Sequence, residues 1–126
     1  DTKLLKSDLS ENQDSLLAEC VWQNGNKHSR SFSFNKADKL VIEDDMAATG
    51  DSYATLVLHP ACQVKVENGK AIVHREDITV CIETNIEPTI EKCWYSEEYG
   101  KEKETHKLCY PLNDNKLKTT IWIEKY

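Results

Sequence analysis

Residues 62–75 read CQVKVENGKAIVHR, and this stretch decides the fold class. Two runs of alternating apolar side chains flank the pair Asn68-Gly69. Both residues of this pair tolerate a positive φ angle, which a tight β-hairpin turn requires. Within each run the apolar side chains lie on one face, because successive side chains of a strand point to opposite sides. The stretch therefore predicts two antiparallel strands joined by a two-residue turn.

The same alternation recurs along the chain, and Asn24-Gly25 predicts a second tight turn. Further strands are expected within residues 15–23, 29–34, 39–43, 53–59, 77–83, 93–96, 106–110 and 119–125. No helical segments are interleaved with them, which excludes a parallel α/β sheet. The prediction is an all-β fold, an antiparallel β-sandwich or barrel of about nine short strands. The sequence does not separate a sandwich from a barrel.

The N-terminal segment has a different character from the rest of the chain. Residues 1–15 are mostly polar, with Leu4, Leu5 and Leu9 at roughly helical spacing. We expect a short N-terminal helix or a loose arm here, followed by a single all-β domain over residues 16–126. A chain of 126 residues has the size of one domain and is long enough to bury a core.

The apolar side of each alternating run predicts the core. These side chains are Trp22, Phe32, Phe34, Leu56, Leu58, Val64, Val66, Val80, Ile121 and Ile123. Trp122 falls on the opposite face of its strand, so its burial requires a second covering layer.

Cysteine usage suggests a compartment. The chain has five cysteines without a C-x-x-C pair, one methionine, and no initiator methionine. This pattern favours a processed protein in an oxidising compartment, periplasmic or secreted. Five cysteines form at most two intramolecular bridges. We expect Cys93–Cys109 and Cys62–Cys81, with Cys20 unpaired.

Residues 93–109, CWYSEEYGKEKETHKLC, predict a hairpin closed by its two terminal cysteines. The register that such a bridge imposes places Trp94 in the core and turns Tyr95 and Tyr99 toward solvent. Exposed tyrosines are efficient contact residues, so Tyr95 and Tyr99 are candidate partner-binding residues. The alternative is an edge hairpin that carries solubilising charge.

Two H-x-x-C pairs, at residues 59–62 and 106–109, raise the question of a zinc site. Side chains three positions apart on a strand point to opposite faces, and the second pair contains no turn residue. We therefore expect no metal and no cofactor.

An acidic segment, EDDMAATGDS, spans residues 43–52. We expect a loop that docks into a basic protein partner through Glu43, Asp44, Asp45, Met46 and Asp51. The alternative is an ordinary acidic connection between strands. The net charge of −6 disfavours nucleic acid and anionic membranes as partners. No apolar run approaches the ~18 residues of a membrane helix.

The sequence contains no nucleophile elbow, phosphate-binding loop or suitably spaced pair of carboxylates, so we expect no enzyme. The prediction is an extracytoplasmic inhibitor or immunity protein that blocks another protein, such as a cell-wall hydrolase or a toxin. The alternative is a small-ligand carrier with a barrel cavity. Residues 20–25, CVWQNG, resemble the first strand of small periplasmic lysozyme inhibitors, a match of six residues that assigns no family.

Overall fold

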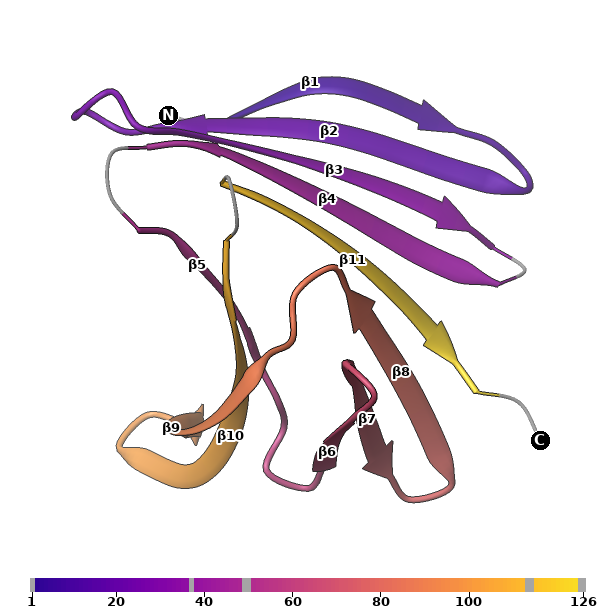
Figure 1. Ribbon diagram of the computed structural model, residues 1–126, viewed down its shortest axis with the longest axis vertical. Helices are drawn as coiled ribbons and strands as arrows, with labels where there is room; N and C mark the ends of the chain where they lie inside the picture. Colours follow the sequence, from indigo (N-terminus) through magenta and orange to yellow (C-terminus); the bar gives the residue numbers. More distant parts are fainter. Residues whose placement is uncertain (1, 37, 49–50, 113–114, 125–126) are drawn as a thin grey trace.

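Antiparallel β-strands make up the fold (Figure 1). The computed structural model describes residues 2–36, 38–48, 51–112 and 115–124, and within them it contains eleven strands and no helix. Hence no helix in these ranges is long and apolar enough to cross a bilayer. The strands are β1 (Thr2–Leu9), β2 (Gln13–Val21), β3 (Lys27–Asn35), β4 (Lys39–Ala47), β5 (Tyr53–Val57), β6 (Gln63–Glu67), β7 (Lys70–Arg75), β8 (Ile78–Thr84), β9 (Thr89–Glu98), β10 (Lys101–Pro111) and β11 (Lys116–Ile123). The predicted all-β class is confirmed.

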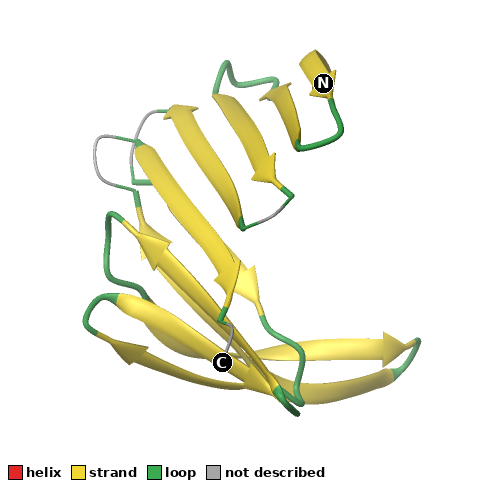
Figure 2. Cartoon of the chain, turned by 90° about the vertical axis from the view of Figure 1, so that its right-hand side faces the viewer, coloured by secondary structure: helices red, strands yellow, loops and turns green. Residues whose placement is uncertain are grey.

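The strands form two open sheets packed as a sandwich. The large sheet has eight strands in the order β1-β2-β3-β4-β11-β8-β7-β6, and the small sheet has three in the order β5-β10-β9. The C-terminal strand β11 lies in the middle of the large sheet, between β4 and β8. Figure 1 shows β1 to β4 side by side at one end of the molecule, and Figure 2 shows how strongly the large sheet curves.

The stretch 62–75 forms the hairpin β6–β7, as its pattern predicts. Glu67 pairs with Lys70 across the turn, so the loop contains two residues. These residues, Asn68 and Gly69, have φ angles of 53° and 77°, as a type I′ turn requires.

The turn between β2 and β3 is longer than predicted. The amide of Trp22 donates to the carbonyl of Asn26 at 2.9 Å, and the amide of Gly25 donates to the carbonyl of Trp22 at 3.0 Å. Gly25 has a φ of 88°, whereas the φ angle of Asn24 is not positive. The hairpin therefore closes with a three-residue loop that ends in a glycine bulge.

Residues 2–9 form strand β1 and correct the prediction of a short helix or loose arm. The strand pairs with β2 from Thr2 opposite Cys20 to Leu9 opposite Asp14, with a register shift between Leu4 and Lys6. Every residue of β1 is exposed. An edge strand with neither face covered needs no apolar alternation, so the period-two pattern is absent from its sequence.

The core lies between the small sheet and strands β7, β8 and β11 of the large sheet. Its buried residues are Ala71, Val73, Ile82, Leu108, Tyr110 and Leu117. Strands β1 to β3 contribute no residue to this cluster, so the end of the large sheet formed by β1 to β4, here called the wing, extends beyond the small sheet.

The fully buried residues are therefore not the ones that the sequence predicts. Leu56, Leu58, Val64, Val80 and Ile121 pack against the buried cluster and are half-buried, as are Phe32 and Val66. Trp22, Phe34 and Ile123 are 44%, 40% and 59% exposed, which contradicts their predicted burial. Trp22 lies in a loop, Phe34 on the wing and Ile123 at a strand end, and in none of these places does the small sheet cover them.

Trp122 is half-buried on the opposite face of β11 without a third layer. The ammonium groups of Lys39 and Lys70 lie 5.2 and 5.6 Å from its ring centres. Long lysine side chains cover apolar surface while their charged ends stay in water. Two flanking lysines thus partly bury Trp122.

Candidate functional site

Residues 43–47 of the acidic segment form strand rather than loop, and residues 49–50 lie outside the part of the chain that the structure describes. Residues 43–47 continue β4, so their side chains alternate between the two faces of the sheet. Glu43 and Asp45 are exposed on one face, whereas Asp44 is buried and Met46 half-buried on the other. The prediction that this segment is a single loop is therefore wrong, whereas its role in binding a partner stays a prediction.

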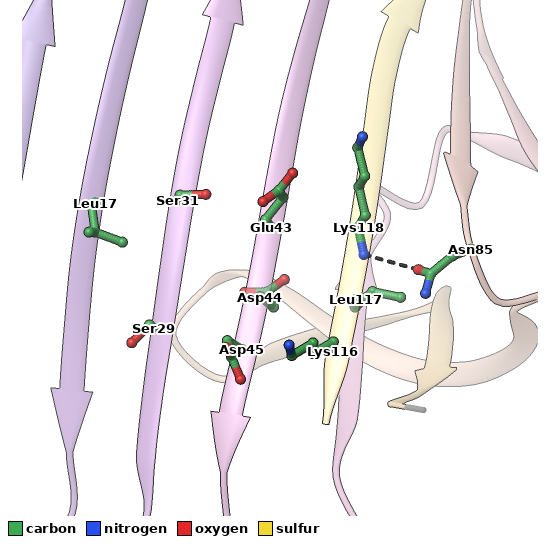
Figure 3. A pocket seen from close by; sticks show the side chains of 10 residues that line it. All are labelled: Leu17, Ser29, Ser31, Glu43, Asp44, Asp45, Asn85, Lys116, Leu117 and Lys118. Atoms are coloured by element: carbon green, nitrogen blue, oxygen red, sulfur yellow. Dashed lines mark hydrogen bonds between the residues drawn. The ribbon is translucent and has the colours of Figure 1, made fainter. Parts of the chain in front are cut away.

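The first face carries a shallow polar groove (Figure 3). Its lining residues are Leu17, Ser29, Ser31, Glu43, Asp44, Asp45, Asn85, Lys116, Leu117 and Lys118. The backbone amide of Lys118 donates to Asn85 Oδ1 at 3.0 Å. Lys116 and Lys118 pair across strands with Asp45 and Glu43, so the exposed charges balance. The groove contains no aromatic ring among its described lining, and we assign it to solvated sheet surface.

Asp44 is the centre of a charged cluster on the second face. Its side chain is 4% exposed and accepts hydrogen bonds from His28 Nε2 at 2.8 Å and Arg30 Nε at 2.6 Å. Arg30 Nη2 also lies 3.4 Å from Asp44 Oδ2. The pairing of β3 with β4 places Arg30 directly opposite Asp44 and His28 two positions along the same face. A buried carboxylate requires such partners, because an unpaired buried charge is costly.

This cluster lines a hollow of about 440 Å³ between the wing and the start of β5, here called the β3–β5 pocket. Its lining residues are Trp22, Asn26, His28, Arg30, Asp44, Met46, Ala48, Asp51, Ser52, Tyr53, Ala54, Thr55 and Leu112. The pocket thus brings together three of the predicted partner-binding residues, Asp44, Met46 and Asp51. Sequence reasoning missed His28, Arg30, Trp22 and Tyr53.

The β3–β5 pocket combines oriented polar groups with aromatic surface. Asp44 engages Nε and Nη2 of Arg30, and Nη1 has no hydrogen bond to the described residues. Because His28 donates through Nε2, its Nδ1 is the other ring nitrogen available to a ligand. Trp22 and Tyr53 are 44% and 66% exposed. This combination of groups is typical of sites for ligands that have both polar groups and an apolar face.

The predicted Cys93–Cys109 bridge does not form, because the register of the β9–β10 hairpin separates the two residues. Cys93 lies opposite Thr105, and Cys109 lies opposite Thr89. Both cysteines are free. Burial raises the pKa of the Cys109 thiol, and hydrogen bonding to the Glu91 carboxylate raises it further.

The predicted Cys62–Cys81 bridge is absent as well, and Cys20 is also free. Strand β7 separates β6 from β8. Cys62 packs at the edge of the core, whereas Cys81 shares the opposite face with Trp122. Burial raises the pKa of the Cys81 thiol, and so does the nearby Glu124 carboxylate.

The two predicted contact tyrosines lie on the β9–β10 hairpin, away from the β3–β5 pocket. Tyr95 is half-buried, with its ring and that of His59 in a T-shaped arrangement at a centroid distance of 5.3 Å, and Tyr99 is fully exposed at the tip. Trp94 is 67% exposed, which contradicts its predicted place in the core. A basic protein partner that contacts the acidic segment, helped by this hairpin, stays a prediction.

His59 belongs to one of the two H-x-x-C pairs, and its contacts are not those of a metal ligand. Its Nε2 lies 3.3 Å from Glu97 Oε1, and its Nδ1 accepts a hydrogen bond from the amide of Ala61 at 3.1 Å. Across the described part of the chain, no three His, Cys, Asp or Glu side chains converge as metal ligands.

A family model described as "Heparinase II/III-like, C-terminal" matches residues 3–124. The chain belongs to the heparinase II/III-like C-terminal family. No curated protein sequence matches it. The match covers nearly the whole chain, strand β1 included, so the N-terminal residues belong to the same family domain as the rest.

Solved structures of heparinases share this heparinase II/III-like C-terminal fold. Heparinase III, the BT4657 gene product, superposes with a TM-score of 0.80 at 18% identity, over 99% of this chain and 22% of that chain. A mutant of the heparan sulfate lyase HepC from Pedobacter heparinus gives a TM-score of 0.84 at 13% identity, with the same coverage. The chain therefore spans about a fifth of the length of these proteins.

The family membership corrects the predicted function. A heparinase-like domain whose fold recurs in a heparan sulfate lyase is not an inhibitor, an immunity protein or a small-ligand carrier. The expectation of no enzyme is contradicted by the same matches, because the absence of a catalytic motif from a single domain does not exclude an enzyme. The six-residue likeness to lysozyme inhibitors has no counterpart in these matches. An extracytoplasmic location is consistent with the family.

Proposed function

We propose that this chain is the C-terminal β-domain of a polysaccharide lyase that acts on an acidic polysaccharide of the heparan sulfate type. The family match over residues 3–124 carries the proposal. The fold supports it, since heparinase III and the lyase HepC contain the same sandwich over 99% of this chain. The net charge of −6 does not exclude such a substrate, because binding depends on local groups rather than on the total charge.

In the proposed enzyme this domain supplies part of the substrate-binding surface. The chain equals 22% of the length of the solved lyases, so most of such an enzyme lies outside it. The β3–β5 pocket offers Arg30 and His28, both held by the buried Asp44, beside exposed aromatic rings. These are binding groups, and we assign them no part in bond cleavage.

The proposed enzyme works in the periplasm or outside the cell. The five free thiols remove the cysteine argument for an oxidising compartment. A different argument supports the location: a long acidic polysaccharide is too large and too highly charged to cross a membrane unaided, so its lyase must meet it outside the cytoplasm.

The test uses the polypeptide in which this domain occurs naturally. The purified protein is incubated with heparan sulfate, with alginate, and with the neutral polysaccharide dextran. A lyase cleaves by elimination and leaves an unsaturated sugar, so we expect ultraviolet absorbance to rise with an acidic polysaccharide and to stay constant with dextran. If heparan sulfate yields no unsaturated sugar, the proposal is overturned, and cleavage of alginate alone would indicate a lyase for another class of acidic polysaccharide.

A further inference from the structure

We infer that the β3–β5 pocket is a subsite for one acidic sugar unit, in which Arg30 holds the anionic group, His28 accepts a hydrogen bond from a sugar hydroxyl through Nδ1, and Trp22 stacks on the sugar ring. The class of ligand, an acidic saccharide, rests on the proposed function. The position of the subsite rests on the geometry of the pocket.

The first step is the buried carboxylate. Asp44 is 4% exposed, yet it lies where the large sheet has no covering layer other than the start of β5. Its hydrogen bonds to Arg30 and His28 fix the direction of both side chains. Groups that are held in place before binding lose less entropy when a ligand arrives. Asp44 is therefore a positioning residue for its two neighbours.

The second step is the set of unused donors. Arg30 directs Nε and Nη2 to Asp44, which leaves Nη1 available at the pocket. The side chains of His28 and Arg30 are 28% and 39% exposed, so a ligand reaches both. A guanidinium group binds carboxylate and sulfate through short charge-assisted hydrogen bonds. These are the anionic groups of acidic polysaccharides.

The third step is the aromatic surface. Trp22 is 44% exposed in the β2–β3 loop, and Tyr53 is 66% exposed at the start of β5. Both residues line the pocket that contains Arg30. An aromatic ring gains energy by covering the apolar C–H face of a sugar, while its polar edge stays in water. Cation and aromatic ring together match a ligand with an anionic substituent on a ring that has one apolar C–H face.

One neighbouring charge opposes an anionic ligand. Asp51 is exposed and lines the same pocket. If the ligand is anionic, removal of this carboxylate must strengthen binding at low salt, because like charges repel. A neutral sugar would not respond in this way. Asp51→Asn therefore distinguishes an acidic saccharide from a neutral one.

The experiment measures binding of a heparan sulfate hexasaccharide to the 126-residue chain by calorimetry at low salt, with a neutral N-acetylglucosamine hexasaccharide as comparison. We expect Arg30→Gln and Trp22→Ala each to weaken binding of the acidic hexasaccharide about tenfold or more. Arg75→Gln and Trp94→Ala are the matched controls, because both residues are exposed outside the pocket and should leave affinity unchanged. Asp51→Asn should strengthen binding of the acidic hexasaccharide alone.

Arg30→Gln leaves Asp44 with fewer partners and can reduce stability, but Trp22→Ala does not touch the Asp44 cluster and tests the pocket by itself. The subsite is overturned if Trp22→Ala binds the acidic hexasaccharide as tightly as wild type does. It is also overturned if the Trp94→Ala control loses as much affinity as Trp22→Ala.

The proposed function is judged separately. If the natural polypeptide cleaves an acidic polysaccharide while Trp22→Ala leaves its KM unchanged, the subsite fails and the lyase stands. If binding depends on the pocket but no acidic polysaccharide is cleaved, the subsite stands and the lyase fails.

Discussion

Asp44 and Asp45 are neighbours in the sequence, and the structure assigns them opposite roles. Asp44 is buried between His28 and Arg30, whereas Asp45 is exposed on the other face of β4. Because a strand alternates its side chains, one position separates a surface charge from a structural one. This residue-scale difference distinguishes the observed cluster from the predicted acidic loop.

Asp44→Asn should lower the free energy of unfolding by about 1 to 3 kcal/mol, because it removes the charge that neutralises Arg30 and weakens the hydrogen bond to His28 Nε2 in a partly buried site. The lower end of this range applies if solvent screens the two partners, which are 39% and 28% exposed. Asp45→Asn is the matched control and should change stability by less than about 0.5 kcal/mol. If urea denaturation gives the same change in the free energy of unfolding for both variants, the difference in burial between Asp44 and Asp45 is contradicted.

Tyr110 presents a different residue-scale question. It is 1% exposed, and its hydroxyl has no hydrogen-bond partner among the described residues. Burial raises the pKa of this phenol to about 12. Relative to its ionised form, the neutral phenol makes a favourable contribution to stability that is complete below about pH 10, the usual pKa of tyrosine in the unfolded chain. That contribution is lost as pH rises from 10 through 12, because the unfolded chain ionises first.

Tyr110→Phe should therefore leave stability at neutral pH unchanged or raise it by up to about 1 kcal/mol, since it removes an unsatisfied buried hydroxyl. Above pH 10 the variant should become progressively more stable than wild type. Urea denaturation of both proteins from pH 7 to 11 measures the difference. The comparison cancels the alkaline effect of the Cys81 and Cys109 thiols, whose pKa values are also raised. A variant that loses stability at every pH would show that the hydroxyl has a partner.

At the scale of the element, each strand register decides which residues meet. The β6–β7 turn has two residues in the left-handed region, and that geometry sets every pair from Glu67 opposite Lys70 onward. The β9–β10 hairpin shows the same principle, because its register separates Cys93 from Cys109. A hairpin is therefore predictable from sequence only when its turn is.

Gly69→Ala tests whether the turn conformation sets the register of the β6–β7 hairpin. A Cβ at Gly69 meets no atom within 4 Å, so the cost comes from the backbone conformation at φ 77° alone. We expect a loss of about 1 to 2 kcal/mol in the free energy of unfolding, with the circular dichroism spectrum preserved. Asn68→Gly is the control, since glycine also adopts φ 53° without strain. A loss above about 3 kcal/mol would indicate a change of register.

At the scale of the whole molecule, the small sheet covers only part of the large one. The buried cluster joins β10 to β7, β8 and β11, while the wing keeps exposed apolar side chains such as Leu16 and Phe34. Stability is therefore uneven along the large sheet, since local opening is easiest where few apolar side chains are buried.

Hydrogen exchange measured by mass spectrometry tests this distribution. Amides of β1 and β2 should exchange well before those of β7, β8 and β10, although all of them are paired within sheets. The edge strand β6 is a useful comparison, because it lies at the opposite end of the large sheet but against the core. Uniform protection across the large sheet would show that the wing is as stable as the rest.

The sequence by itself determined the all-β class and the β6–β7 hairpin, because period-two alternation and turn chemistry are local properties of the chain. The same logic carried to residue 47 would have placed Asp44 and Met46 on the face opposite to Glu43 and Asp45, since the alternation continues through the acidic segment, but the pairing of Asp44 with Arg30 depends on the β3–β4 register. Burial of a side chain, by contrast, is not a local property of the chain. Trp22 and Phe34 have the pattern of core residues, yet their exposure depends on how far a second sheet extends. Only the tertiary structure decided that, by placing β5, β10 and β9 over β7, β8 and β11 and leaving the wing open beside the β3–β5 pocket.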